Sequence, residues 1–211
     1  MGVVPSTSID EDFWYGKKVF LTGHTGFKGS WMTLWLQLLG AKVTGYSLCP
    51  NTKPSLFEKL KLEEICKSYF GDINDNLSLR DQLLTSNPDI IFHLAAQPIV
   101  SMGYDDPFGT FNTNVMGVVN VLEACRELNE DIPVVIVSSD KCYNNENEGK
   151  RFKVGDALGG KDPYSASKAC TEIVTQAYKN SFFNVERGPR VASARAGNVV
   201  GGGDWSDNRL L

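Results

Sequence analysis

Histidine and cysteine are scarce, and their pattern argues against metal-binding and disulfide-bonded proteins. The chain of 211 residues contains 2 histidines and 5 cysteines. The cysteines are scattered, odd in number and form no C-x-x-C pair, which favours reduced thiols in a cytoplasm over a disulfide framework or a zinc site. We therefore expect a cytoplasmic protein without a metal centre.

Basic runs and long apolar runs are also lacking. The net charge is −4, and basic residues form no cluster in the sequence. Neither nucleic acid nor an anionic membrane surface is therefore an expected partner. No apolar run approaches the length of a membrane span, and the acidic N-terminus, with Asp10 and Asp12, does not resemble a signal peptide.

One stretch, residues 17–40, combines a buried strand, a glycine-rich turn and an amphipathic helix. Gly23 lets the backbone reverse, Gly26 lets the main chain approach a diphosphate, and Gly29 lets helix and strand pack closely. The start of the helix offers free N–H groups to phosphates. This context predicts a dinucleotide site. The turn residues expected to bind the cofactor are Gly23, His24, Thr25, Gly26, Phe27, Lys28 and Gly29.

The rest of the chain alternates between strand and helix patterns. Strands are predicted at residues 17–21, 42–47, 69–73, 89–94, 132–138 and 190–196, helices at 59–67, 78–86, 107–128 and 164–179, and loops at 48–60 and 144–162. This alternation predicts an α/β fold: a doubly wound, mainly parallel, Rossmann-type sheet with helices on both faces. Binding and chemistry are then expected at the carboxyl ends of the strands.

The expected domain organisation is a short leader followed by one large domain. Residues 1–15 are predicted to be mobile, with Phe13, Trp14 and Tyr15 packing down just before the first strand. Residues 16–211 are predicted to form a NAD-binding domain, and the start of a substrate-binding region is expected after about residue 198.

A tyrosine and a lysine lie four positions apart on the predicted helix from residue 164. Tyr164 and Lys168 therefore project from one helix face. An ammonium group beside a phenol stabilises the phenolate. Such a tyrosine can accept a proton from a sugar hydroxyl while a nicotinamide accepts a hydride. Ser139 ends the preceding strand, and its hydroxyl is a candidate ligand for the same substrate oxygen.

Five motifs together resemble the extended short-chain dehydrogenase/reductase superfamily: TGHTGFKG, HLAAQP, SSDK, YSASK and ARAGNVVGGGDW. The pair Asp140-Lys141 is similar to the nucleotide-sugar 4,6-dehydratases rather than to epimerases. GHTGFKGSW, SSDKCY and GNVVGGGDW resemble the dehydratase branch that acts on CDP-glucose. The resemblance, which extends from Gly16 to the end, implies NAD as cofactor, CDP-glucose as substrate and a homodimer or homotetramer.

The resemblance implies an internal redox cycle in deoxysugar biosynthesis of the O-antigen type. Tyr164 deprotonates the C4 hydroxyl and NAD takes the C4 hydride. Water then leaves from C5–C6, and the hydride returns to C6 to give a 4-keto-6-deoxy sugar. Ser139 holds the substrate oxygen, Lys168 tunes Tyr164 and orients the nicotinamide ribose, and Asp140 protonates the departing C6 hydroxyl.

Further contacts are implied by the positions of the motifs. Asp72 and Ile73 flank the adenine, and the Ala95-Ala96-Gln97 turn borders the diphosphate and the nicotinamide. The implied cofactor contacts outside the glycine turn are Asp72, Ile73, Leu94, Ala95, Ala96, Gln97, Tyr164 and Lys168. The implied substrate contacts are Gln97, Ser139 and Asn198.

The chain departs from its relatives beside the expected acid. The dTDP-glucose relatives carry a glutamate as the C5 base, where this chain has Lys141. A lysine can act as a base only if its pKa is lowered, and otherwise it stabilises a developing enolate as an ammonium. An ion pair with Asp140 would keep Lys141 charged. The sequence leaves both roles open.

Two further departures concern the cofactor and the length. No acid ends the second strand, where NAD-binding proteins usually hold the ribose, and His24 and Lys28 add cationic or donor groups to the glycine turn. We expect NAD rather than NADP because no arginine lies at that strand end. Family members exceed 300 residues, which favours a catalytically incomplete NAD-binding fragment as one alternative. The other alternative is another NAD(P)-dependent epimerase or reductase, against which Asp140-Lys141 argues.

Overall fold

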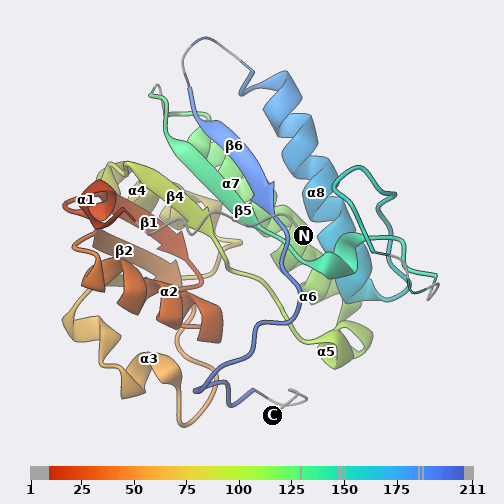
Figure 1. Ribbon diagram of the computed structural model, residues 1–211, viewed down its shortest axis with the longest axis horizontal. Helices are drawn as coiled ribbons and strands as arrows, with labels where there is room; N and C mark the ends of the chain where they lie inside the picture. The colour runs from red at the N-terminus through yellow and green to blue at the C-terminus, as the bar shows by residue number, and fades with distance from the viewer. Residues whose placement is uncertain are drawn as a thin grey trace, which may run out of the picture.

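The computed structural model describes residues 10–128, 130–146, 149, 151–184, 186 and 188–206. These residues form a parallel sheet of six strands in the order β3-β2-β1-β4-β5-β6 (Figure 1). The order reverses beside β1, which creates a crevice between the carboxyl ends of β1 and β4. The strands are β1 (Lys18–Thr22), β2 (Lys42–Ser47), β3 (Lys67–Phe70), β4 (Ile90–His93), β5 (Pro133–Val137) and β6 (Arg190–Ala194).

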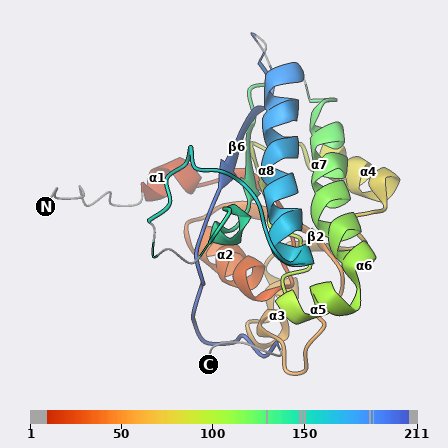
Figure 2. The ribbon, with the colours of Figure 1, turned by 90° about the vertical axis from the view of Figure 1, so that its right-hand side faces the viewer.

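Helices cover the two faces of the sheet unequally. The layer of α4, α7 and α8 lies on one face and α2 on the other (Figure 2). The helices are α1 (Glu11–Trp14), α2 (Phe27–Leu38), α3 (Leu56–Lys59), α4 (Asn76–Ser86), α5 (Val100–Asp105), α6 (Pro107–Phe111), α7 (Gly117–Cys125) and α8 (Pro163–Ser181), with the shorter turns η1 (Leu62–Glu64), η2 (Asn112–Met116) and η3 (Asp140–Cys142). The prediction of helices on both faces is confirmed at the centre of the sheet, whereas Ala192 and Ala194 of β6 are exposed on the α2 side.

The central strand β1 is buried on both faces, which explains its continuous apolar sequence. Phe20 faces the core beneath α4 and α7, whereas Val19 and Leu21 face α2 and pack with Leu36. Successive side chains of a strand point to opposite faces, so a strand covered on both sides needs apolar residues at every position.

Several element boundaries differ from the predictions. The third strand lies at residues 67–70 rather than 69–73, because its pairing with β2 begins at Thr44 and ends at Ser47. The predicted loop at residues 48–60 contains α3, whose Ser55 cap accepts a hydrogen bond from Glu58 N at 3.3 Å. That capping pattern was visible in the sequence. The predicted helix at residues 59–67 is reduced to the single turn η1.

The long helix predicted at residues 107–128 is interrupted and preceded by another helix. Its central turn, η2, is a π-helix, and α5 before it was not predicted. In the leader, residues 1–9 lie outside the described residues, while α1 occupies residues 11–14. Trp14 packs against the core, but Phe13 and Tyr15 are exposed, so the expected packing is wrong for those two side chains. Within the described part of the chain, no helix is long and apolar enough to cross a membrane.

Candidate functional site

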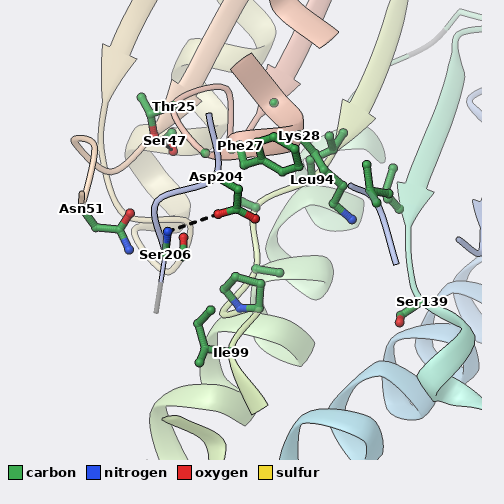
Figure 3. A pocket seen from close by; sticks show the side chains of 18 of the residues that line it. Thr25, Phe27, Lys28, Ser47, Asn51, Leu94, Ile99, Ser139, Asp204 and Ser206 are labelled. Carbon is green, nitrogen blue, oxygen red and sulfur yellow. Dashed lines mark hydrogen bonds between the residues drawn. The ribbon is translucent and has the colours of Figure 1, made fainter. Parts of the chain in front are cut away.

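A cavity of about 570 Å³ opens at the carboxyl ends of the strands. Figure 3 shows Thr25, Ser47 and Asn51 toward one end and Ser139 toward the other. The cavity brings together most of the residues predicted from the sequence. The predicted residues that line it are Gly23, Thr25, Gly26, Phe27, Lys28, Gly29, Asp72, Ile73, Leu94, Ala95, Ala96, Ser139, Lys141, Tyr164, Lys168 and Asn198.

The glycine turn has the geometry that a close approach of backbones requires. Gly23 has φ +76° and donates its N–H to Tyr46 O at 2.9 Å, and a Cβ at this position would lie 2.7 Å from Ala95 N. A Cβ on Gly29 would lie 2.0 Å from Gly23 O. At Gly26 the nearest atom to such a Cβ is Gly23 O, at 3.5 Å. Gly23 and Gly29 therefore serve the packing of the turn, whereas Gly26 leaves open space beside the cavity.

The residues around this open space suit a nicotinamide dinucleotide. Gly26 is the N-cap residue of α2 and has no side chain with which to cap the first N–H groups of this helix. A helix start of this kind attracts phosphate through its free N–H groups and partial positive charge. Lys28 and Lys168 line the same cavity, so cationic side chains accompany the helix start. A diphosphate would fill the space that a side chain at Gly26 would occupy.

The end of β2 carries hydroxyl groups in place of the usual acid. Thr25 Oγ1 donates to Leu48 O at 2.8 Å and lies 2.8 Å from Ser47 Oγ. These bonds join the glycine turn to the end of β2. Asn51 also lines this part of the cavity (Figure 3). The end of the cavity beside β2 is therefore lined by neutral donors and acceptors.

His24 differs from the expectation of a cationic group beside the diphosphate. Its side chain is fully buried outside the cavity, between Phe57 and Phe70, with Nε2 3.1 Å from Ser68 Oγ. Burial lowers the pKa of His24 to about 4, so the imidazole is neutral at pH 7. A Cβ on Gly45 would lie 2.2 Å from the imidazole ring. The side chain of His24 therefore packs the turn against β2 and β3.

Tyr164 and Lys168 both line the cavity from the first turns of α8. Asp162 caps this helix by accepting the N–H of Ser165 at 2.9 Å, and Pro163 occupies its first turn. Lys168 is buried, and this burial, together with the positive charge of Lys28, lowers its pKa to about 8. The lysine is therefore still mostly an ammonium near neutral pH.

Ser139, Asp140 and Lys141 follow β5 as a short hydrogen-bonded turn. Ser139 Oγ donates to Asp140 Oδ1 at 3.2 Å and accepts from Lys141 N at 3.2 Å. Lys141 Nζ lies 3.2 Å from both carboxylate oxygens of Asp140. Ser139 and Lys141 line the cavity, whereas Asp140 does not. Lys141 and Asp140 therefore form a half-exposed ion pair beside the cavity.

Gln97 is directed away from the cavity, and its contacts reveal a residue that sequence reasoning missed. Its side-chain amide donates to Thr110 Oγ1 at 2.8 Å, and its N–H donates to Asn114 Oδ1 at 2.7 Å. Asn114 is buried in the π-helical turn η2 and donates to Ser167 Oγ at 2.9 Å. It thereby joins the loop after β4 to α8. The signal in the sequence was an asparagine inside the predicted helix at residues 107–128, because asparagine has a low helix propensity.

Comparison with known proteins shows relatives with a longer chain. The chain is 49% identical over 207 residues to the CDP-glucose 4,6-dehydratase of Salmonella typhimurium. The aligned region covers 96% of this chain and 58% of that protein. The structure is similar to that of a putative epimerase from Burkholderia cenocepacia, with a TM-score of 0.73 and 26% identity over 93% of this chain and 58% of that one. It is also similar to the Thermus thermophilus UDP-glucose 4-epimerase solved with NAD, with a TM-score of 0.72 and 27% identity over 84% of this chain and 54% of that one.

These relatives confirm the predicted fold and the resemblance to nucleotide-sugar 4,6-dehydratases. The chain spans 58% of the length of the Salmonella protein and about half of each solved structure. Residues 20–186 match the sequence model of the family described as GDP-mannose 4,6 dehydratase. This match covers the glycine turn, the Ser139 turn and the Tyr164–Lys168 pair, and the chain belongs to that family.

Proposed function

We propose that this chain is the NAD-binding part of an enzyme that dehydrates CDP-glucose to CDP-4-keto-6-deoxy-glucose. The observation that carries the proposal is the shared cavity: the glycine turn, Ser139 and the Tyr164–Lys168 pair come from distant parts of the sequence and line one space. The likeness to the Salmonella protein supports the substrate. A cytoplasmic location and a role in deoxysugar biosynthesis belong to the same proposal.

The side chains divide into two groups by the step they serve. A bound NAD would supply reversible hydride transfer. Tyr164 accepts the proton of the C4 hydroxyl, and the ammonium of Lys168 stabilises the phenolate that forms. Ser139 orients the substrate oxygen. Asp140 and Lys141 serve the loss of water. The Asp140 carboxylate accepts the C5 proton and returns it, as the acid, to the departing C6 hydroxyl, while Lys141 is the charge that stabilises the enolate.

The remaining predicted contacts have roles at the two ends of the cavity. Asp72 and Ile73 flank the adenine, and Ala95 and Ala96 border the diphosphate. Asn198 follows β6 and contacts the substrate. A NAD-binding domain from residue 16, with the start of a substrate-binding region after about residue 198, stays a prediction and is part of the proposal.

A homodimer or homotetramer is part of the proposal. Apolar side chains are exposed on the layer that contains α6 and α8 (Figure 2), among them Phe108, Met116 and Ile173. Helices with exposed apolar residues of this kind favour association with a second copy.

Replacing Gly26 by Val should abolish NAD binding without preventing folding. The nearest protein atom to a Cβ at Gly26 is 3.5 Å away, so the fold accommodates the side chain, which then occupies the place of the diphosphate. Isothermal titration calorimetry with NAD measures the loss. Gly155→Val is the matched control, because Gly155 is exposed and nothing lies within 4 Å of its Cβ position. Unchanged affinity in a folded Gly26→Val protein would contradict the NAD assignment.

Installing an acid at Ser47 should increase the preference for NAD over NADP. Hydrogen bonds from the ribose hydroxyls to a carboxylate contribute about 1.5–3 kcal/mol, or about tenfold or more in affinity. The same carboxylate repels the 2′-phosphate of NADP. The ratio of the two dissociation constants for Ser47→Asp, compared with the neutral Ser47→Asn, gives the effect. If the ratio is the same in both variants, the ribose is not recognised at the end of β2.

A further inference from the structure

A buried carboxylate lies one helical turn beyond Lys168 on α8. Glu172 is 5% exposed, and its Oε2 accepts hydrogen bonds from Ser193 Oγ at 2.7 Å and Arg195 Nη2 at 2.8 Å. Its other oxygen, Oε1, is buried as well. A carboxylate is rarely buried without a structural or functional reason, because its desolvation is costly.

The arginine that pairs with this carboxylate also contacts two other segments. The side chain of Arg195 is 17% exposed, and Nη1 donates to Val154 O at 3.1 Å in the loop before α8. The guanidinium also lies over the ring of Tyr143, 4.8 Å from its centre. Arg195 follows β6 and leads directly to Asn198 in the cavity. The ion pair therefore joins α8 to the segment that carries the expected substrate contact.

Among the charged and titratable groups around Lys168, Glu172 supplies the carboxylate. From α2, Lys28 lowers the pKa of Lys168, in addition to burial, while Glu172 on α8 and Cys142 in η3 raise it. His93 of β4 is buried with a pKa of about 3, caused by burial and by the charge of Lys168, and is neutral. Tyr164 precedes Lys168 by one turn on α8. Of these groups, Glu172 is the one that carries a negative charge at neutral pH.

Glu172 is ionised despite its burial. Burial by itself would raise the pKa of Glu172, but the hydrogen bonds from Arg195 and Ser193 overcome this effect and the pKa lies below its ordinary value. A buried charge at this position acts strongly on its neighbours, since the low local dielectric screens it little.

We propose that Glu172 is a positioning residue of the site: its buried carboxylate, held by Arg195 and Ser193, keeps the Lys168 ammonium charged and fixes α8 against the segment after β6. Lys28 and the desolvation of Lys168 both favour a neutral amine, and Glu172 opposes them from the same helix. The inference rests on the proposed function only for the role of Lys168, which is to stabilise the phenolate of Tyr164.

The test measures the titration of Lys168 directly. The rate of acetylation of Lys168 by acetic anhydride, followed by mass spectrometry over a range of pH, gives the pKa of its amine without cofactor or turnover. In the unmodified chain we expect a pKa near 8. In Glu172→Gln the pKa of Lys168 should decrease. A decrease of the pKa by one unit makes the acetylation of Lys168 about tenfold faster at a pH well below the pKa. Glu172→Asp keeps the charge and should restore the original value at least in part.

A control separates the charge of Glu172 from a general loosening of α8. Glu123 on α7 accepts a hydrogen bond from Tyr178 Oη of α8 at 2.7 Å, so Glu123→Gln removes another carboxylate that contacts this helix. The pKa of Lys168 should not change in this variant. If Glu172→Gln does not fold, Glu172→Gln combined with Arg195→Met removes both charges and leaves none unpaired. The pKa of Lys168 should decrease in this double variant as well.

Two results would overturn the inference. One is an unchanged pKa of Lys168 in a folded protein that lacks the Glu172 carboxylate, and the other is an equal decrease in Glu123→Gln. Neither depends on NAD, so a failure of this inference is distinguishable from a failure of the proposed function, which the calorimetric measurement on Gly26→Val detects.

Discussion

Replacing Tyr164 by Phe should decrease the conversion of CDP-glucose by about 10²–10⁴-fold, the usual loss for a positioned acid or base. The substitution removes the phenolic oxygen that accepts the proton of the C4 hydroxyl and leaves the ring in place. The measurement requires a protein in which this chain is joined to the remaining length of its relatives. NADH absorbance after rapid mixing with CDP-glucose follows the first step, and product analysis follows the whole reaction.

The control is Tyr104→Phe, because Tyr104 is exposed on α5 and lies outside the cavity. Asp140→Asn provides the second comparison. If Asp140 serves only the loss of water, this variant should still oxidise C4 and should accumulate NADH and a 4-keto-glucose nucleotide. A normal 4-keto-6-deoxy product from Asp140→Asn, or full turnover by Tyr164→Phe, would show that the residue roles are assigned wrongly.

Acidification should lower the folding stability of the protein in part because His24 becomes protonated. The substitution His24→Phe should remove this contribution. The pKa of His24 is lowered from 6.5 to about 4 by burial, so between these values the unfolded chain binds a proton that the folded chain does not. This contribution to stability is fully present above pH 6.5 and decreases as the pH falls toward 4. The loss amounts to about 3 kcal/mol, because a tenfold change in proton affinity is worth about 1.4 kcal/mol.

Urea denaturation of the chain and of His24→Phe, at a series of pH values from 7 down to about 4, measures this contribution. The difference in the free energy of unfolding between the two proteins at pH 7 reports the change in packing against Phe57 and Phe70. The change of this difference with pH reports the protonation of His24. His93 is also buried and neutral, and its protonation at low pH lowers the stability of both proteins alike. An equal loss of stability on acidification in both proteins would contradict the assignment to His24.

Much of the fold was predictable because its signals are local. Residues 42–47 were predicted as a strand and form β2, and the helix predicted from residue 164 is α8, indicated by the Pro163 that opens it. The boundaries of β3 were misplaced because the pairing with β2, rather than the apolar pattern, decides where this strand begins. The turn η2 was missed for the same kind of reason, since the bonds of Asn114 to the loop after β4 and to α8 are distant in sequence.

Local sequence was enough to predict that a glycine turn joins a buried strand to a helix, and that hydroxyl, tyrosine and lysine side chains follow at strand ends and helix starts. Those features depend on backbone conformations and spacings that a few neighbouring residues dictate. Two contacts could not be predicted in this way: His24 packs inward against Ser68, which is 44 residues away, and Glu172 pairs with Arg195. The orientation and charge of such side chains depend on burial and on partners from other elements, and these exist only once the sheet and its helices are packed together.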